Sequence, residues 1–324
     1  MREPLFVKQN SEKWKSFEQT PATDPDEVAE RFIKITDDLA YAKTFYPQSK
    51  TTTYLNGLAS TLHQSIYKNK TESSNRFLLF WKVELPLIFK TYEKQLLYAF
   101  LFFFIFCLMG ILSAKYDEGF FPLILGPGGD EYVQQTKENI AKGDPFGVYK
   151  QGNEFSMFFN IAANNIYIEL ITFVSGIAFS IGSVYFLCRN AMMLGAFQYF
   201  FFSKGLGIQS ILVIWIHGTL EISSIIIAGA AGLVLGNSIL FPKTYRRIDS
   251  LKRGAKDGMK MAVGIVPLFL IAAFFEGFVT RHTGMPAWLS VTILASSLSF
   301  MIWYVVIYPN KLYKKLNKNG AKEN

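Results

Sequence analysis

The chain has 324 residues, of which 50% are hydrophobic and 16% aromatic, and its formal net charge is +8. The apolar residues are gathered in long runs, which is typical of membrane proteins and argues against a soluble globular domain. Lysine and arginine are concentrated beside these runs, where they fix membrane topology and contact anionic lipid. We therefore expect these basic residues to contact the lipid bilayer, and we expect no nucleic-acid partner.

Residues 1–94 contain no apolar run of membrane length and predict a cytoplasmic helical domain. Two apolar stripes at helical spacing predict an antiparallel pair of amphipathic helices. The stripes are Val28, Phe32, Ile35 and Leu39, and then Leu55, Leu58, Leu62 and Ile66. Residues 76–94 mix aromatic and aliphatic side chains with lysine and arginine, which is typical of an interfacial helix on an anionic leaflet.

Residues 95–310 predict a transmembrane domain, and residues 311–324 a basic cytoplasmic tail. The predicted spans are 96–114, 166–187, 190–204, 218–240, 261–279 and 288–307. Residues 115–165 form an acidic loop that we place outside the cytoplasm, and residues 206–216 a short bridging helix. The basic residues after position 241 predict a cytoplasmic segment. The fold class is therefore an all-α polytopic membrane protein. Six spans place both termini in the cytoplasm, and five spans are possible if the 190–241 region only re-enters the membrane.

Two ionisable residues, His217 and Glu221, lie inside the apolar run 206–241. Positions four apart share one face of a helix, and charged groups within a membrane usually face the interior of a bundle. The same face continues through Ala228, Gly232 and Gly236, small residues that allow close helix packing. We expect this face to contact another helix, either within the chain or at a subunit interface.

The His217/Glu221 pair has three interpretations. It could form a structural hydrogen bond where the helix breaks at Gly218, or it could belong to a transport or ion-relay path. A metal or catalytic centre is the third, and it is disfavoured because a zinc site needs three or four protein ligands while Glu169 and Glu276 are distant in sequence. We therefore predict no catalytic residue, no metal and no cofactor.

Asparagines mark the start of the predicted second span. Asn164 and Asn165 could bind a ligand, although capping or interhelical hydrogen bonding is the more common role of such residues. Glu169 lies one turn further on the same face and is the expected partner of a group near His217 if it points inward. Glu276 is expected to be a solvated carboxylate at the outer interface.

Several motifs resemble the stage II sporulation protein M family of bacterial and archaeal membrane proteins. They are HGTLE at 217–221, AGAAGL at 228–233, NN at 164–165, LG at 194–195, LAYA at 39–42 and TFYP at 44–47. The resemblance implies an all-helical inner-membrane protein without known catalytic activity, and the N-terminal block is similar to the larger branch of the family. It also implies partners, since the namesake is similar to an organiser of peptidoglycan-degrading proteins and other members look like companions of MoxR-type ATPases.

We predict a non-enzymatic scaffold in the bacterial cytoplasmic membrane. It would form a homodimer and recruit cell-envelope or other membrane proteins, possible partners being peptidoglycan-remodelling proteins or a MoxR-type ATPase. The alternative is a transporter or channel for a small solute or lipid, with His217, Glu221 and Glu169 along its path.

Overall fold

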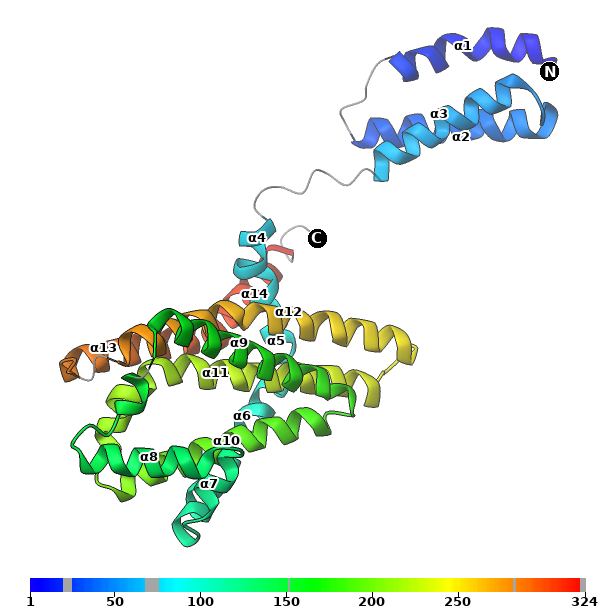
Figure 1. The fold of residues 1–324 in the computed structure, drawn as a ribbon. Coiled ribbons are helices and arrows are strands. Elements are labelled where there is room, and N and C mark those ends of the chain that lie inside the picture. The colour runs from blue at the N-terminus through cyan, green and yellow to red at the C-terminus, as the bar shows by residue number, and fades with distance from the viewer. Residues whose placement is uncertain (20–24, 68–75, 151, 282–283, 321–324) are drawn as a thin grey trace. The chain divides into compact units, whose positions relative to one another are not determined.

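The computed structural model describes residues 1–19, 25–67, 76–150, 152–281 and 284–320, and these residues form helices and connecting turns without any β-strand (Figure 1). The chain divides into two compact units, Met1–Phe77 and Leu78–Asn324. The predicted all-α class is confirmed.

The first unit contains three helices, α1 (Glu3–Gln19), α2 (Pro25–Phe45) and α3 (Lys50–Tyr67). Both predicted stripes contribute to its core, because Ile35 and Leu55 are fully buried. Helix α1 adds Phe6 and Trp14 to the same core, and the Trp14 indole N–H donates to an Asp38 carboxylate oxygen at 2.7 Å. The first unit therefore has a hydrophobic core of its own.

The second unit contains six long helices: α6 (Glu93–Tyr116), α9 (Glu154–Val174), α10 (Ile181–Ser203), α11 (Gly207–Leu240), α12 (Arg247–Phe274) and α13 (Ala287–Ile302). Shorter elements connect or extend them: α4 (Arg76–Leu79), η1 (Phe80–Glu84), α5 (Leu85–Thr91), α7 (Phe120–Leu125), α8 (Gly129–Ala141), η2 (Gly147–Lys150), η3 (Ser175–Ile177), η4 (Phe275–Val279), η5 (Trp303–Ile307) and α14 (Tyr308–Gly320). Helix α11 is central, and the other five long helices pack against it (Figure 1).

Among the described residues, five helical segments are long and apolar enough to cross a membrane: Glu93–Tyr116, Glu154–Ile177, Gly207–Leu240, Arg247–Val279 and Ala287–Lys318. Helix α10 is nearly as long as α6 and runs antiparallel to α11. Near one end of α10, Gln198 accepts a hydrogen bond from the Trp215 indole, and near the other Leu187 packs on Gly229. The described part of the second unit is therefore a bundle of five candidate spans and a sixth long helix, α10, which is not among the candidate spans.

Three predicted boundaries in the bundle are wrong. The predicted break between 187 and 190 is absent, because α10 is continuous from Ile181 to Ser203. The predicted span 166–187 is interrupted, because α9 ends at Val174 and the chain turns before α10 begins at Ile181. Phe179 (φ 54°) and Ser180 (φ 70°) make this turn. The predicted bridging helix 206–216 and the break at Gly218 are also absent, because α11 is continuous from Gly207 to Leu240. A single glycine costs a helix only about 1 kcal/mol, which the packing around α11 offsets.

The small-residue face of α11 packs inside this chain. Ala228 is fully buried, and a Cβ atom at Gly232 would overlap the Ser183 side chain at the start of α10. A Cβ atom at Gly236 would likewise overlap Ser180. Of the two roles considered for this face, the structure places its residues in internal packing.

Residues 78–91 belong to the second unit, although the sequence groups them with the N-terminal domain. Leu85 and Phe89 of α5 are buried in the bundle core. The Tyr92 hydroxyl donates to an Asp257 carboxylate oxygen at 2.8 Å, close to the start of α6. The segment predicted to lie on the membrane surface is therefore packed against α12 and α14.

The predicted acidic loop is largely folded. Its helices α7 and α8 carry Phe121 and Val133 into a second apolar core of this unit, which also contains Phe146, Phe201 and Ile214. The loop therefore covers the end of the bundle at which α10 finishes and α11 begins.

Candidate functional site

A cavity of about 640 Å³, lined by both apolar and polar side chains, lies among the helices of the second unit. It is formed where α6, α9, α10, α11 and η4 meet, and α7 and α8 each contribute one residue. Its polar lining is Tyr132, Asn160, Asn164, Asn165, Asn190, His217, Glu221 and Glu276. Bundle interiors are a common place for small-molecule and metal sites.

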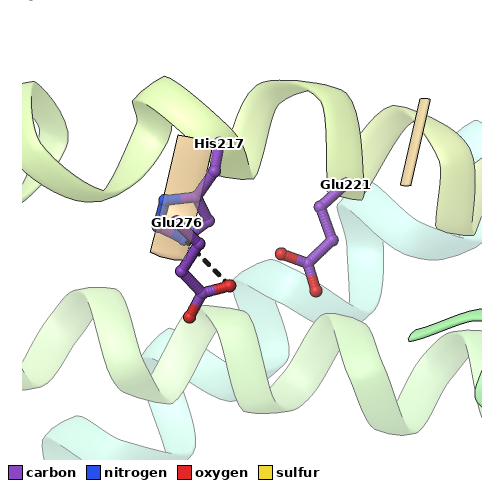
Figure 2. A group of neighbouring side chains, drawn as sticks. All are labelled: His217, Glu221 and Glu276. Atoms are coloured by element: carbon purple, nitrogen blue, oxygen red, sulfur yellow. Dashed lines mark ion pairs between the residues drawn. The ribbon is translucent and has the colours of Figure 1, made fainter. Parts of the chain in front are cut away.

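His217 lies at the centre of the polar lining and is 4% exposed. Its Nδ1 atom is 3.0 Å from the Thr280 hydroxyl oxygen, and its Nε2 atom is 3.9 Å from a Glu276 carboxylate oxygen (Figure 2). Both partners follow α12, which runs antiparallel to α11. The imidazole therefore joins α11 to the residues at the end of α12, which are far away in the sequence.

Glu221 completes a group of three ionisable side chains. Figure 2 shows that His217 and Glu221 project from the same side of α11, in agreement with their spacing of one helical turn. One nitrogen or oxygen atom from each of His217, Glu221 and Glu276 lies within 4.8 Å of the other two. The Asn165 amide interacts with the Glu221 carboxylate, so α9 also contributes to the group.

Glu276 owes its position to a π-helical turn at the end of α12. The Thr280 N–H donates to the Phe275 carbonyl oxygen at 2.8 Å, a hydrogen bond that skips one residue more than in an α-helix. This turn directs both Glu276 and Thr280 toward His217. The Glu276 side chain is 18% exposed, and this corrects the expectation of a solvated carboxylate.

The asparagines lie along α9 and α10. Helix α9 begins earlier than predicted, since the Asn153 side chain caps it by accepting from the N–H groups of Phe155 and Ser156. Asn164 and Asn165 are therefore within the helix and not at its start. Asn160 and Asn164 are exposed, so the cavity is open on the α9 side.

A second cavity of about 450 Å³ adjoins the first one. The two share Tyr132, Asn160, Ile161 and Glu276, and the second is bounded by Gly152 and Asn153 before α9. Glu276 thus faces both cavities. The second cavity lies between the residues that precede α9 and the cavity that His217 lines.

Glu169 is not part of this group. It is 2% exposed, does not line the cavity, and neither of its carboxylate oxygens has a hydrogen-bond partner among the described residues. The sequence reasoning selected Glu169 as the partner near His217, whereas the structure brings Glu276 there. The signal for Glu276 was present, since it is an acid inside an apolar run and such residues tend to face a bundle interior.

These features define the class of the protein: it is a polytopic α-helical membrane protein whose bundle contains an open cavity lined in part by polar side chains. A model of the stage II sporulation protein M family matches residues 99–281, more than half of the chain, so the chain belongs to this family. The matched region includes α9 to α12 and all three members of the ionisable group. This confirms the resemblance seen in the sequence motifs.

A second model, of a domain of unknown function (DUF8413), matches residues 4–68, which cover α1 to α3. No curated protein and no solved structure matches the chain.

Proposed function

We propose that the second unit binds a small polar solute in its cavity and carries it across the membrane. The observation that supports this proposal is the group of asparagine, histidine and glutamate side chains that line part of a 640 Å³ cavity among apolar helices. Burying carboxylates and amides in a membrane bundle is costly, and such groups often mark a solute path. The volume also lies in the range of about 300–1,000 Å³ that is usual for small-molecule sites.

The solute class follows from the lining. Four asparagine amides each offer donors and an acceptor, and no lysine or arginine is among the described lining residues. The chemistry suits an uncharged or cationic molecule with several hydrogen-bonding groups. A lipid acyl chain would leave these amides without partners, so the polar-solute form of the transport hypothesis is preferred.

Stopped-flow light scattering on proteoliposomes tests the proposal. Liposomes with and without the protein would be exposed to gradients of two uncharged probes, glycerol and urea, and two cationic probes, choline and putrescine. We expect faster entry of at least one probe, and slower entry after Asn165→Leu or Glu221→Gln. Glu169→Gln is the matched control, because Glu169 lies outside the cavity lining. Equal entry into protein-containing and protein-free liposomes for every probe would refute the proposal.

A second proposed role, recruitment of partner proteins, is supported by the first unit. This unit has its own core around Trp14 and Ile35 and corresponds to a separate domain model. We propose a bacterial cytoplasmic membrane location with both termini inside, and as partners a second copy of the chain, envelope proteins or a MoxR-type ATPase. Copurification with mass spectrometry would compare the full chain with a chain lacking residues 1–77, and an unchanged set of partners would contradict this role.

The proposed orientation has its own test. A cysteine placed at Gly128 and another at Asp249 should be labelled from opposite sides of the membrane by an impermeant maleimide. Labelling from the same side would contradict the orientation.

A further inference from the structure

We propose that His217, Glu221 and Glu276 bind one divalent transition-metal ion, for which Zn²⁺ is the probe. This inference does not depend on the proposed transport, because it concerns a resident ion that binds in the absence of any solute. It rests on the geometry of the three side chains, on the contact with Thr280 and on the charge of the cavity.

The donor set and its spacing fit such an ion. Imidazole nitrogen and carboxylate oxygen bind Zn²⁺ at about 2.0–2.2 Å, so neighbouring ligand atoms lie roughly 3.3–3.6 Å apart in a tetrahedral site. The Nε2–Oε2 distance between His217 and Glu276 is 3.9 Å, and all three ligand atoms lie within 4.8 Å of one another. The ligand atoms would reach tetrahedral spacing if the carboxylate oxygens of the two glutamates moved by about 1 Å. Three protein ligands leave a fourth position open toward the cavity, as in catalytic zinc sites.

The Thr280 contact orients the imidazole for metal binding. Ligating histidines usually donate their other ring N–H to an oxygen, which fixes the tautomer. Here the Nδ1 atom lies 3.0 Å from the Thr280 hydroxyl oxygen. Proton placement on Nδ1 leaves the lone pair on Nε2, the atom that faces Glu276.

The charge of the cavity provides an independent argument. Glu221 and Glu276 are two acids at close range, and the described lining residues of their cavity include no lysine or arginine. Two carboxylates in such a setting repel each other and lose hydration. A divalent cation offsets both charges at once. The competing explanation is a protonated carboxyl group that shares its proton with the other acid, and this pair would need no metal.

Metal analysis of the full-length protein separates these explanations. The protein would be purified in detergent with a tag that contains no histidine, dialysed against a chelator, and titrated with Zn²⁺ in competition with a fluorescent zinc indicator. Inductively coupled plasma mass spectrometry then gives the stoichiometry. We expect one Zn²⁺ per chain, and loss of this stoichiometric zinc after Glu276→Gln or His217→Ala.

Two further variants make the test specific. Glu169→Gln replaces another buried carboxylate that lies outside the cluster, and it should keep the zinc. Thr280→Val removes the contact to Nδ1 while keeping the shape of the side chain, and it should weaken zinc binding by about 10–100-fold. A thermal melt of each variant shows whether it is folded. If His217→Ala does not fold, the test rests on Glu276→Gln, which is close to isosteric with the wild-type side chain.

Three results would overturn the inference. They are a wild-type protein without stoichiometric zinc after titration, zinc retained by Glu276→Gln, and equal loss of zinc in Glu169→Gln and Glu276→Gln. Solute entry into proteoliposomes is measured separately on chelator-treated protein. A protein that moves solute but binds no metal would thus refute the metal site and leave the proposed transport intact.

Discussion

Replacing Gly232 by alanine should destabilise the membrane unit, whereas the same replacement at Gly218 in the same helix should not. A Cβ atom at position 232 would overlap the Ser183 side chain and come within 2.9 Å of the Thr172 carbonyl oxygen. Ser183 cannot move away freely, because its hydroxyl donates to that same oxygen at 2.5 Å. Helix α11 must therefore separate from α9 and α10.

The expected size of the effect follows from these contacts. Forcing a methyl group into a well-packed interior typically costs about 1–3 kcal/mol. At Gly218 the nearest atom to an added Cβ is the Ile222 Cδ1 atom at 3.9 Å, which is an ordinary contact. Alanine is also the better helix former by about 1 kcal/mol, so Gly218→Ala should leave the stability unchanged or raise it slightly.

The chain carries a built-in probe for this measurement. Its two cysteines, Cys107 and Cys188, both lie in the membrane unit, one half-buried and one buried. A dye that becomes fluorescent on reaction with thiols reports their exposure during heating in detergent. At about 2–4 °C per kcal/mol, the midpoint for Gly232→Ala should fall by roughly 2–12 °C. An unchanged midpoint for Gly232→Ala, or an equal fall for Gly218→Ala, would refute the close approach of these helices.

Two further predictions concern other parts of the chain. Trp14→Ala removes an indole that is 3% exposed and should lower the stability of the first unit by about 3–5 kcal/mol. The first unit should then become sensitive to trypsin, while the melting midpoint of the membrane unit, measured with the thiol dye, should not change. Continued protection of the first unit from trypsin would contradict this prediction. Burial and the hydrogen bond to Asp257 raise the pKa of Tyr92. The neutral hydroxyl therefore stabilises the folded state fully at pH values below the ordinary tyrosine pKa of about 10, and this stabilisation is lost as the pH rises above that value. Tyr92→Phe should therefore be less stable than wild type at pH 8, and the difference should narrow at higher pH; a difference in melting temperature that does not depend on pH would argue against this contribution.

The sequence predicted the spans whose ends are marked by charge. The apolar runs 96–114 and 261–279 lie inside α6 and inside α12 with η4, and basic residues mark both ends of each run: Lys94 and Lys115, and Lys260 and Arg281. The turn after Val174 was missed because it has no such marker. Gly176 packs directly on Gly232 of α11, but Ile177 and Phe179 in the same turn are apolar and more than half exposed, so the turn has no charged residue that would show it in the sequence.

The candidate site was predictable only as far as one helix determines it. The spacing of His217 and Glu221 is sufficient to place them on one face. Glu276 and Thr280 come from the far end of another helix, and their position depends on how α12 packs against α11 and on one π-helical turn. Neither condition is local in sequence. The asparagine face of α9 was recognised, but its place along the helix depended on the cap at Asn153.

The length of α11 has a consequence for the bilayer around the protein. Its 34 residues rise by about 1.5 Å each, which gives a helix of about 51 Å, whereas the hydrocarbon layer is about 30 Å thick. Tilting alone would require an angle of about 54°, beyond the usual range of 0–40°. One end of α11 must therefore project from the hydrocarbon layer. At its N-terminal end, Ile214 is enclosed by Phe121, Val133 and Phe146 of the folded loop segment. The folded loop therefore covers Ile214 on the projecting part of α11, while Ile208 in its first turn stays 75% exposed.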